Sequence, residues 1–281
     1  MLRDGIRDDQ WDRIKDLLPG RIGHVGATAR NNRLFIDAVL YRLRTGIPWR
    51  DLPERFGDFK NIHRRFSRWA EKGLWTNLLS LLTEDADEEY VMIDSTLVRA
   101  HQHSSGAVGR NPSDQAIGRS RGGLTIHARV DALGNPTEFF LTAGQVHDLA
   151  GAEVLLTDIE TGAVIADKAY DAEERVVKPL EQARIEVVIP PRSCRKTPRE
   201  YDRELYKARH LIENFFCKLK HFRGIATRYD KLSRNFLAAL QFVAILIWLN
   251  CKRHLLSTLR GGSSRARLLG WFPEQGLDQA A

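Results

Sequence analysis

The sequence predicts an α/β protein in which an all-helical segment precedes a mixed five-stranded sheet with flanking helices. Apolar residues recur at helical spacing over residues 8–82. The period then changes, and five short strand-like runs follow between residues 90 and 191. The first three runs are adjacent and the later ones are separated by helical stretches, which is typical of a hairpin followed by crossover connections.

In the helical segment, WDRIKDLL and LFIDAVLYRLRTG have the apolar spacing of helices, and Gly46 with Pro48 ends the second. DLPERF, a break at Gly57-Asp58 and FKNIHRRFSRWAEKG then resemble a helix–turn–helix unit. One side of the last helix is apolar, and the other carries four basic residues: Lys60, Arg64, Arg65 and Arg68. This pattern is typical of a recognition helix in a DNA groove, and also of any amphipathic helix with a solvated basic face.

The five predicted strands are YVMIDSTLV, LTIHARVDA, PTEFFLTAG, GAVIADKAY and IEVVIPP. DLAGAEVLLTDI and DAEERVVKPLEQA are the predicted helices between the later strands. Ser104–Gly123 is rich in Gly, Ser and Arg, and we expect a mobile loop there. The chain thus divides into a helical part over 1–84, a mixed part over 88–257 and a loose tail over 258–281.

The charge is unevenly distributed. The 281 residues include 43 Lys and Arg and 36 Asp and Glu, a net charge of +7. Residues 1–80 carry +6, residues 81–189 carry −10 and residues 190–281 carry +11. Basic segments suit a polyanion, but the acidic middle would repel one unless divalent cations offset its carboxylates. Two solvated basic faces around an acidic linker are the alternative.

Several features favour a protein of a reducing cytosol. The apolar run at 236–249 is shorter than a bilayer span. The N-terminus lacks the apolar region of a signal peptide. Three cysteines form no CxxC pair, which argues against a zinc ribbon or a disulfide framework. We therefore expect a cytoplasmic protein.

YKARHLIENFFCKLKHF, residues 206–222, is predicted to form one helix with a narrow polar stripe. At about 100° per residue, Arg209, Glu213 and Lys220 fall within a 60° arc beside Tyr206, and the apolar residues fall opposite. Glu213 is a candidate metal ligand, and Arg209 and Lys220 are candidate phosphate contacts. A helix of mixed charge exposed to solvent is the alternative.

Two aspartates interrupt apolar strands. Asp94 lies in VMIDST, and Asp167 closes VIAD. A carboxylate in such a place is costly unless it is paired, hydrogen-bonded or metal-bound. If the two strands are neighbours, both carboxylates reach one edge of the sheet, where a packed helix could add Glu213. Asp171 is the alternative to Asp167, but Asp167 is preferred because it ends the strand itself.

The same helix carries a specific resemblance to a known family. Tyr206-x2-Arg209-x3-Glu213-x6-Lys220 matches the Y-(2)-R-(3)-E-(6)-K signature of bacterial insertion-sequence DDE transposases. Flanking motifs resemble the insertion-sequence-five branch: RTGIPWRDLPERFG, VMIDSTLVRAH, AIGRSRGGL, DALGNP, GQVHD, ADKAYD and KLKHFRGIATRYDK. The resemblance covers about residues 8–250.

The resemblance implies a ribonuclease-H-like core over 88–257, preceded by a DNA-binding domain over 1–84. It makes Asp94, Asp167 and Glu213 the catalytic and metal-binding acids, holding Mg²⁺ or Mn²⁺, with two ions expected. It also implies action on double-stranded DNA: the terminal inverted repeats and a target. The residues then expected to contact DNA are Tyr206, Arg209, Lys220 and Arg223, together with Lys60, Arg64, Arg65 and Arg68. A homodimer or higher synaptic assembly is expected.

Other functions remain open from the sequence. A nuclease or resolvase on the same fold would cut DNA without strand transfer. A catalytically idle DNA-binding regulator derived from a transposase would keep only the binding surface. Gly118–Gly122 matches GxSxG, but it is not placed between a strand and a helix as a hydrolase nucleophile requires.

Overall fold

The computed structural model describes residues 5–21, 28–104, 123–195 and 198–251. The helices and strands described belong to one compact unit, residues 1–250. Residues 105–122 of the predicted loop and the whole predicted tail lie outside the described residues.

The N-terminal part is helical, as predicted. Its α-helices are α1 (Asp8–Ile14), α2 (Asn32–Thr45), α3 (Phe59–Glu71) and α4 (Leu74–Leu82). The Asn31 side chain caps α2 by accepting a hydrogen bond from Leu34 N, and Gly46 ends the helix in the left-handed conformation, with φ of 73°. The prediction of a helix over DLPERF is wrong. Two short 3₁₀ turns, Trp49–Asp51 and Glu54–Phe56, form here instead, and each follows a proline, Pro48 or Pro53. Proline lacks the N–H that a continuous helix needs.

The sheet is mixed, as predicted, but among the described residues it has six strands rather than five. Its main order is β3-β2-β1-β4-β5. The antiparallel strands are β1 (Tyr90–Ala100), β2 (Gly123–Val130) and β3 (Pro136–Ala143), and β4 (Ala163–Ile165) and β5 (Glu186–Val188) run parallel to β1. The additional strand, β6 (Thr227–Arg228), pairs with the end of β1. Two residues carry no periodic signal, so the sequence pattern could not reveal this strand.

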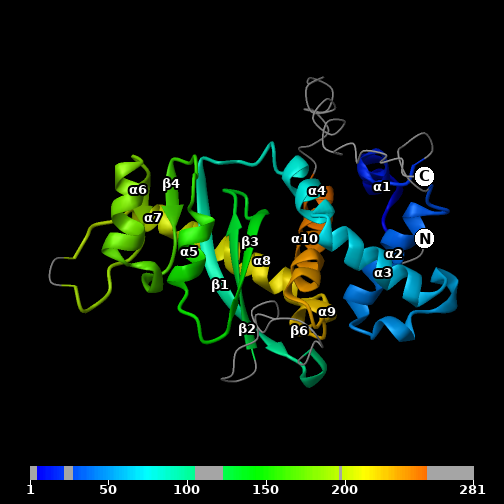
Figure 1. The fold of residues 1–281 in the computed structure, drawn as a ribbon. Coiled ribbons are helices and arrows are strands. Elements are labelled where there is room, and N and C mark those ends of the chain that lie inside the picture. Colours follow the sequence, from blue (N-terminus) through cyan, green and yellow to red (C-terminus); the bar gives the residue numbers. More distant parts are fainter. Residues whose placement is uncertain (1–4, 22–27, 105–122, 196–197, 252–281) are drawn as a thin grey trace, which may run out of the picture. The chain divides into compact units, whose positions relative to one another are not determined.

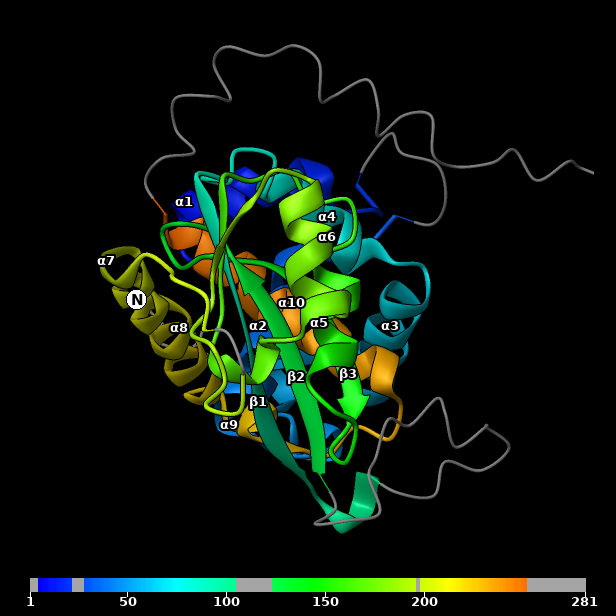
Figure 2. The same cartoon turned by 90° about the vertical axis from the view of Figure 1, so that its left-hand side faces the viewer.

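Helices cover both faces of the sheet (Figures 1 and 2). On one face, α5 (Leu149–Leu155) and α6 (Lys178–Gln182) bury Val91, Ile93 and Val164. On the other, α8 (His210–Lys220) and α10 (Ser233–Asn250) pack in one core with Met92 and Ile165. Shorter helices α7 (Arg203–Tyr206) and α9 (Arg223–Ala226) flank α8. Because neighbouring residues of β1 point to opposite faces, one strand contributes to both cores.

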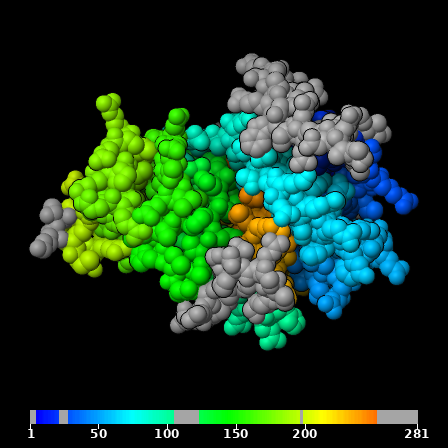
Figure 3. Space-filling model, in the orientation of Figure 1, coloured from blue at the N-terminus to red at the C-terminus, as the bar shows by residue number. Residues whose placement is uncertain are grey.

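Helix α10 joins the two parts of this unit. It contacts β3 on one side and α3 and α4 on the other. In Figure 3, its orange atoms show only in a seam between the cyan helices and the green sheet region. By length and composition α10 could cross a membrane, but 72% of it is buried inside the fold. It is therefore placed as a core helix.

Candidate active site

Strand pairing places Asp94 and Asp167 on neighbouring strands. Met92 of β1 pairs with Ile165 of parallel β4. Asp94 comes two residues after Met92, and Asp167 comes two residues after Ile165. Since side chains alternate between faces, both aspartates share the face of Met92 and Ile165, which is the face that α8 covers. The predicted neighbourhood of the first and fourth strands is confirmed.

Glu213 comes from the helix on that face. A nearly continuous helical rod runs from Arg203 to Lys220, with a 3₁₀ turn at Lys207–Arg209. Ile212, Phe215 and Leu219 are buried on its inner side, and Glu213 lies on the exposed side. This agrees with the predicted division into an apolar side and a polar stripe.

Arg209 joins two of the three acids. Its Nη2 donates to Asp94 Oδ2 at 2.9 Å, and its Nη1 donates to Glu213 Oε1 at 2.5 Å. The other Asp94 oxygen, Oδ1, accepts a hydrogen bond from Ser95 N at 2.8 Å. Asp167 caps a 3₁₀ turn by accepting from Ala169 N at 2.8 Å. The polar stripe thus meets the middle of β1 and the end of β4.

The electrostatics reflect this crowding. Burial raises the pKa of the Asp94 carboxyl, and repulsion from Asp167 and Glu213 adds to the rise, while the Ser95 N–H and Arg209 oppose it. Burial works against the charged form of Arg209, but Asp94, Tyr206 and Glu213 outweigh it and raise the pKa of the guanidinium. Asp94 and Glu213 are thus each paired with the opposite charge of Arg209.

The donor chemistry at this site fits a hard divalent cation. Asp94, Asp167 and Glu213 offer carboxylate oxygens, the ligands that Mg²⁺ and Mn²⁺ prefer. Within the described ranges, however, no three Asp, Glu, His or Cys side chains are gathered as a metal site. Between Asp94 and Glu213 the guanidinium of Arg209 supplies the positive charge instead.

The other predicted DNA contacts of this region lie near the acids or just beyond them. Lys220 Nζ donates to Thr96 Oγ1 at 2.6 Å, two residues after Asp94 on β1. Burial raises the pKa of the half-buried Tyr206 hydroxyl, and the charges of Asp167 and Asp94 contribute. Arg223 is exposed at the start of α9.

The basic residues of α3 do not act as one set. Lys60, Arg64 and Arg68 are exposed, as the helical pattern predicts. Arg65 instead stacks over Phe35 and Trp69, with its guanidinium carbon 4.3 and 4.5 Å from the ring centroids, and it hydrogen-bonds Asn32. Burial lowers its pKa to about 10. Helix α3 lies away from α8 in both ribbon views (Figures 1 and 2).

Sequence reasoning missed a polar group behind the acids, on the opposite face of the sheet. Ser95 Oγ donates to Asp148 Oδ1 at 2.8 Å, and Ser95 also interacts with the buried Tyr170 hydroxyl. These residues tie the middle of β1 to the segment after Asp167. The signal was present, because Asp148 lies in GQVHD and Tyr170 in ADKAYD.

Asp171, the alternative second acid, has a different environment. Its side chain is fully buried and pairs with Arg195 at 2.7 Å, and Arg192 N donates to it at 2.8 Å. Both oxygens of this acid are engaged, Oδ1 by Arg195 and Arg199 and Oδ2 by Arg192 N and Arg195 Nε. This supports the preference for Asp167.

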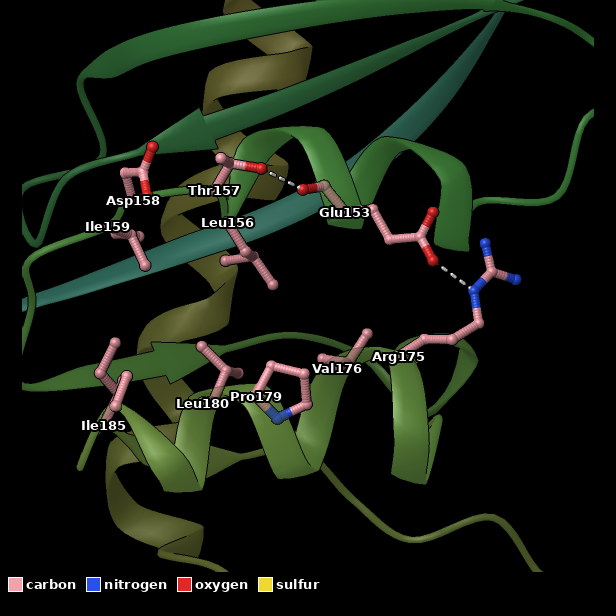
Figure 4. A pocket seen from close by; sticks show the side chains of 11 residues that line it. Glu153, Leu156, Thr157, Asp158, Ile159, Arg175, Val176, Pro179, Leu180 and Ile185 are labelled. Carbon is pink, nitrogen blue, oxygen red and sulfur yellow. Dashed lines mark hydrogen bonds and ion pairs between the residues drawn. The ribbon is translucent and has the colours of Figure 1, made fainter.

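A groove of about 380 Å³ lies between α5 and α6 (Figure 4). Leu156, Val176 and Leu180 line it, and the Glu153–Arg175 ion pair stands at one end. Its residues continue the core on the face that Asp94 and Asp167 do not share. The groove is therefore separate from the carboxylates.

Comparisons with known proteins are consistent with this geometry. Residues 85–249 match the family "Transposase DDE domain", and residues 6–79 match "Putative transposase of IS4/5 family". A "Putative transposase for insertion sequence element IS6501" of Brucella ovis is 37% identical over 125 residues, which are 44% of this chain and 96% of the relative. No solved structure matches the chain.

Two further relatives are similar. An "Uncharacterized protein y4sN" of Sinorhizobium fredii is 52% identical over 104 residues, 37% of this chain and 83% of the relative. A "Putative transposase for insertion sequence element IS402" of Burkholderia cepacia is 31% identical over 157 residues, 52% of this chain and 70% of the relative.

Proposed function

Because the chain belongs to the IS4/5-type DDE transposases, we propose that it binds the terminal inverted repeats of an insertion sequence, cuts the element ends and joins their 3′-hydroxyls to target DNA. The observation that carries this proposal is the meeting of two adjacent parallel strands, β1 at its middle and β4 at its end, with one helix. Asp94 and Asp167 follow paired positions of β1 and β4, and one guanidinium links Asp94 to Glu213 of α8.

We propose that Asp94, Asp167 and Glu213 hold the divalent cations, Mg²⁺ or Mn²⁺, with two ions bound. When bound, such ions activate a water or a 3′-hydroxyl and stabilise the leaving oxygen. The chain's own residues place the DNA. Arg209, Lys220 and Tyr206 line the polar stripe beside the acids and are suited to hold the scissile phosphodiester.

The helical part, residues 1–84, is proposed to bind the element ends. Exposed Lys60, Arg64 and Arg68 provide cations on one side of α3. Residues 88–257 form the proposed catalytic part. A helix–turn–helix contact and a homodimeric or larger synaptic complex in the bacterial cytoplasm belong to the same proposal.

The test uses purified protein and labelled element-end DNA. Asp94→Asn, Asp167→Asn and Glu213→Gln are each expected to lower cleavage by about 10³-fold or more, because each removes a charged ligand from a group that acts as a unit. End binding should persist. The matched control is Glu204→Gln, an exposed acid on the same helical rod that pairs with Lys207 rather than with Arg209.

Strand transfer separates a transposase from a nuclease. Pre-cleaved ends incubated with a plasmid should become covalently joined to it. Near-normal nicking by any of the three acid variants would remove that residue from the site. Nicking without joining would favour a nuclease or resolvase instead, and binding without nicking would favour an idle regulator.

A further inference from the structure

Arg209 donates hydrogen bonds to oxygens of two acids that are proposed to bind the metal ions. One planar cation takes Oδ2 of Asp94 with Nη2, at 2.9 Å, and Oε1 of Glu213 with Nη1, at 2.5 Å. The second oxygen of Asp94 already accepts from Ser95 N. Each Asp94 oxygen thus already accepts one hydrogen bond, and at Oδ2 the donor is itself a cation, Arg209.

Arg209 is held by two ion pairs, and one side of its side chain is open to solvent. Its side chain is 21% exposed, between Asp94 at 14% and Glu213 at 54%. The more exposed bond, to Glu213, can open into solvent without disturbing the core. Arg209 also ends the 3₁₀ turn between α7 and α8, where the helical rod departs from regular geometry.

The acids need a counter-charge. Asp94, Asp167 and Glu213 repel one another, and the two neighbours accordingly contribute to the raised pKa of Asp94. Arg209 lies between two of them and offsets part of this repulsion through its ion pairs with Asp94 and Glu213. A divalent ion on Asp94 Oδ2 and Glu213 Oε1 would lie beside the guanidinium that donates to the same two oxygens, and the two cations repel each other. Arg209 and a divalent ion therefore compete for this place.

We propose that Arg209 is a built-in counter-cation, which holds the metal-binding oxygens of Asp94 and Glu213 and is displaced when a divalent ion loads. This rests on the proposed function, since it takes these acids as the metal ligands. Displacement frees the guanidinium, which then becomes available to a DNA phosphate. The apparent metal affinity equals the intrinsic affinity multiplied by the fraction of molecules in which Arg209 leaves the site free.

The test measures Mn²⁺ binding to the full-length protein without DNA, by the electron paramagnetic resonance signal of free Mn²⁺. Arg209→Gln removes the competing cation and is expected to tighten Mn²⁺ binding about tenfold or more, which corresponds to a site that Arg209 occupies for at least about nine-tenths of the time. Asp94→Asn combined with Arg209→Gln should abolish this gain.

Lys220→Gln is the matched control. Lys220 lies on the same polar stripe and carries the same charge, but it binds the Thr96 hydroxyl rather than a carboxylate. Its removal changes only the general field at the acids, so its effect should stay below about threefold in this solvent-accessible setting. Equal gains in the two variants, or no gain in Arg209→Gln, would overturn the proposal.

Arg209→Lys guards against a folding defect. Lysine keeps the charge but lacks the planar fork with which Arg209 meets each acid through a separate nitrogen, so this variant should bind Mn²⁺ with an affinity between wild type and Arg209→Gln. An affinity equal to or below wild type in a folded Arg209→Lys protein also contradicts the proposal. The transposase assignment is tested separately: a protein that shows the Mn²⁺ shift but neither cuts nor joins DNA would overturn that function alone.

Discussion

At the scale of single residues, Asp171 shows how one buried carboxylate organises the segment beside Asp167. It accepts from Arg192 N at 2.8 Å and from Arg195 Nε at 2.8 Å, so it binds the chain after β5 to the chain after β4. Burial works to raise its pKa, but the ion pair with Arg195 and the Arg192 N–H prevail, and the pKa of Asp171 is lowered.

Asp171→Asn is expected to cost about 3 kcal/mol of unfolding free energy at pH 7, because Arg195 loses its buried partner. A carboxyl whose pKa is lower in the folded protein stabilises above its unfolded pKa, about 3.9, and loses that contribution as the pH falls through its folded pKa. In urea unfolding, the difference in unfolding free energy between wild type and Asp171→Asn should therefore be smaller at about pH 3 than at pH 7.

Glu173→Gln is the control for this prediction. Glu173 pairs with the same Arg195, but its side chain is 44% exposed. The expected cost is below about 1 kcal/mol. Equal costs for the two substitutions, or a difference between wild type and Asp171→Asn that does not depend on pH, would argue against the pair as described.

At the scale of elements, α3 combines a binding surface with a packing surface. Arg64→Ala with Arg68→Ala should weaken DNA binding and lower the slope of log affinity against log salt by about 0.9 for each phosphate that is no longer neutralised. Stability should change little, because both side chains are exposed. Fluorescence anisotropy at several salt concentrations measures the slope.

Arg65→Ala is expected to behave in the opposite way. Its stacking on Phe35 and Trp69 stabilises the fold, so the substitution should cost about 1–2 kcal/mol of unfolding free energy and leave the salt slope nearly unchanged. A steep loss of salt dependence in a stable Arg65→Ala protein would instead assign this residue to DNA.

Helix α5 approaches β2 closely enough to require glycine. A Cβ on Gly151 would overlap the ring of His127, which is fully buried and hydrogen-bonds Thr142 at 2.8 Å. We expect Gly151→Ala to cost about 1–3 kcal/mol by overpacking. In Gly151→Ala with His127→Ala, the added methyl should cost less than it does alone. Thermal unfolding of the four proteins measures this coupling, and strict additivity would contradict the overlap.

At the scale of the whole folded unit, the helical part and the sheet share one core through α10. Trp75 of α4 meets Phe242 of α10 edge-on, with ring centroids 5.2 Å apart. Arg42 of α2 forms a buried ion pair with Asp230 at 3.1 Å, in the segment between β6 and α10. Packing therefore crosses the predicted boundary near residue 84, which itself remains a prediction.

Residues 85–251 expressed alone are expected to be unfolded or aggregated, because removal of α1–α4 exposes the apolar side of α10. Co-expression with residues 1–84 should restore solubility, and the full chain should unfold in one transition by calorimetry. A monomeric, cooperatively folded 85–251 fragment would show that the two parts are independent domains.

Local patterns alone predicted much of this protein. The alternation of YVMIDST placed Asp94 on a strand, which is correct, and VIAD placed Asp167 at the end of a strand, whereas β4 ends two residues earlier, at Ile165. The spacing of 206–222 placed Glu213 away from the buried Ile212 and Phe215. Such periods depend only on the geometry of one element. The order of helices and main strands followed for the same reason.

Only the tertiary structure decided what several of these side chains contact. Arg65 and Arg209 belong to basic or polar stripes in sequence, yet one packs on aromatic rings and the other joins two acids, one of them 115 residues away. Strand β6 likewise exists only because Arg99 pairs with Thr227. Helical and strand periodicity fix the direction in which a side chain points, but its partner is fixed by chain segments that the fold brings together from a distance.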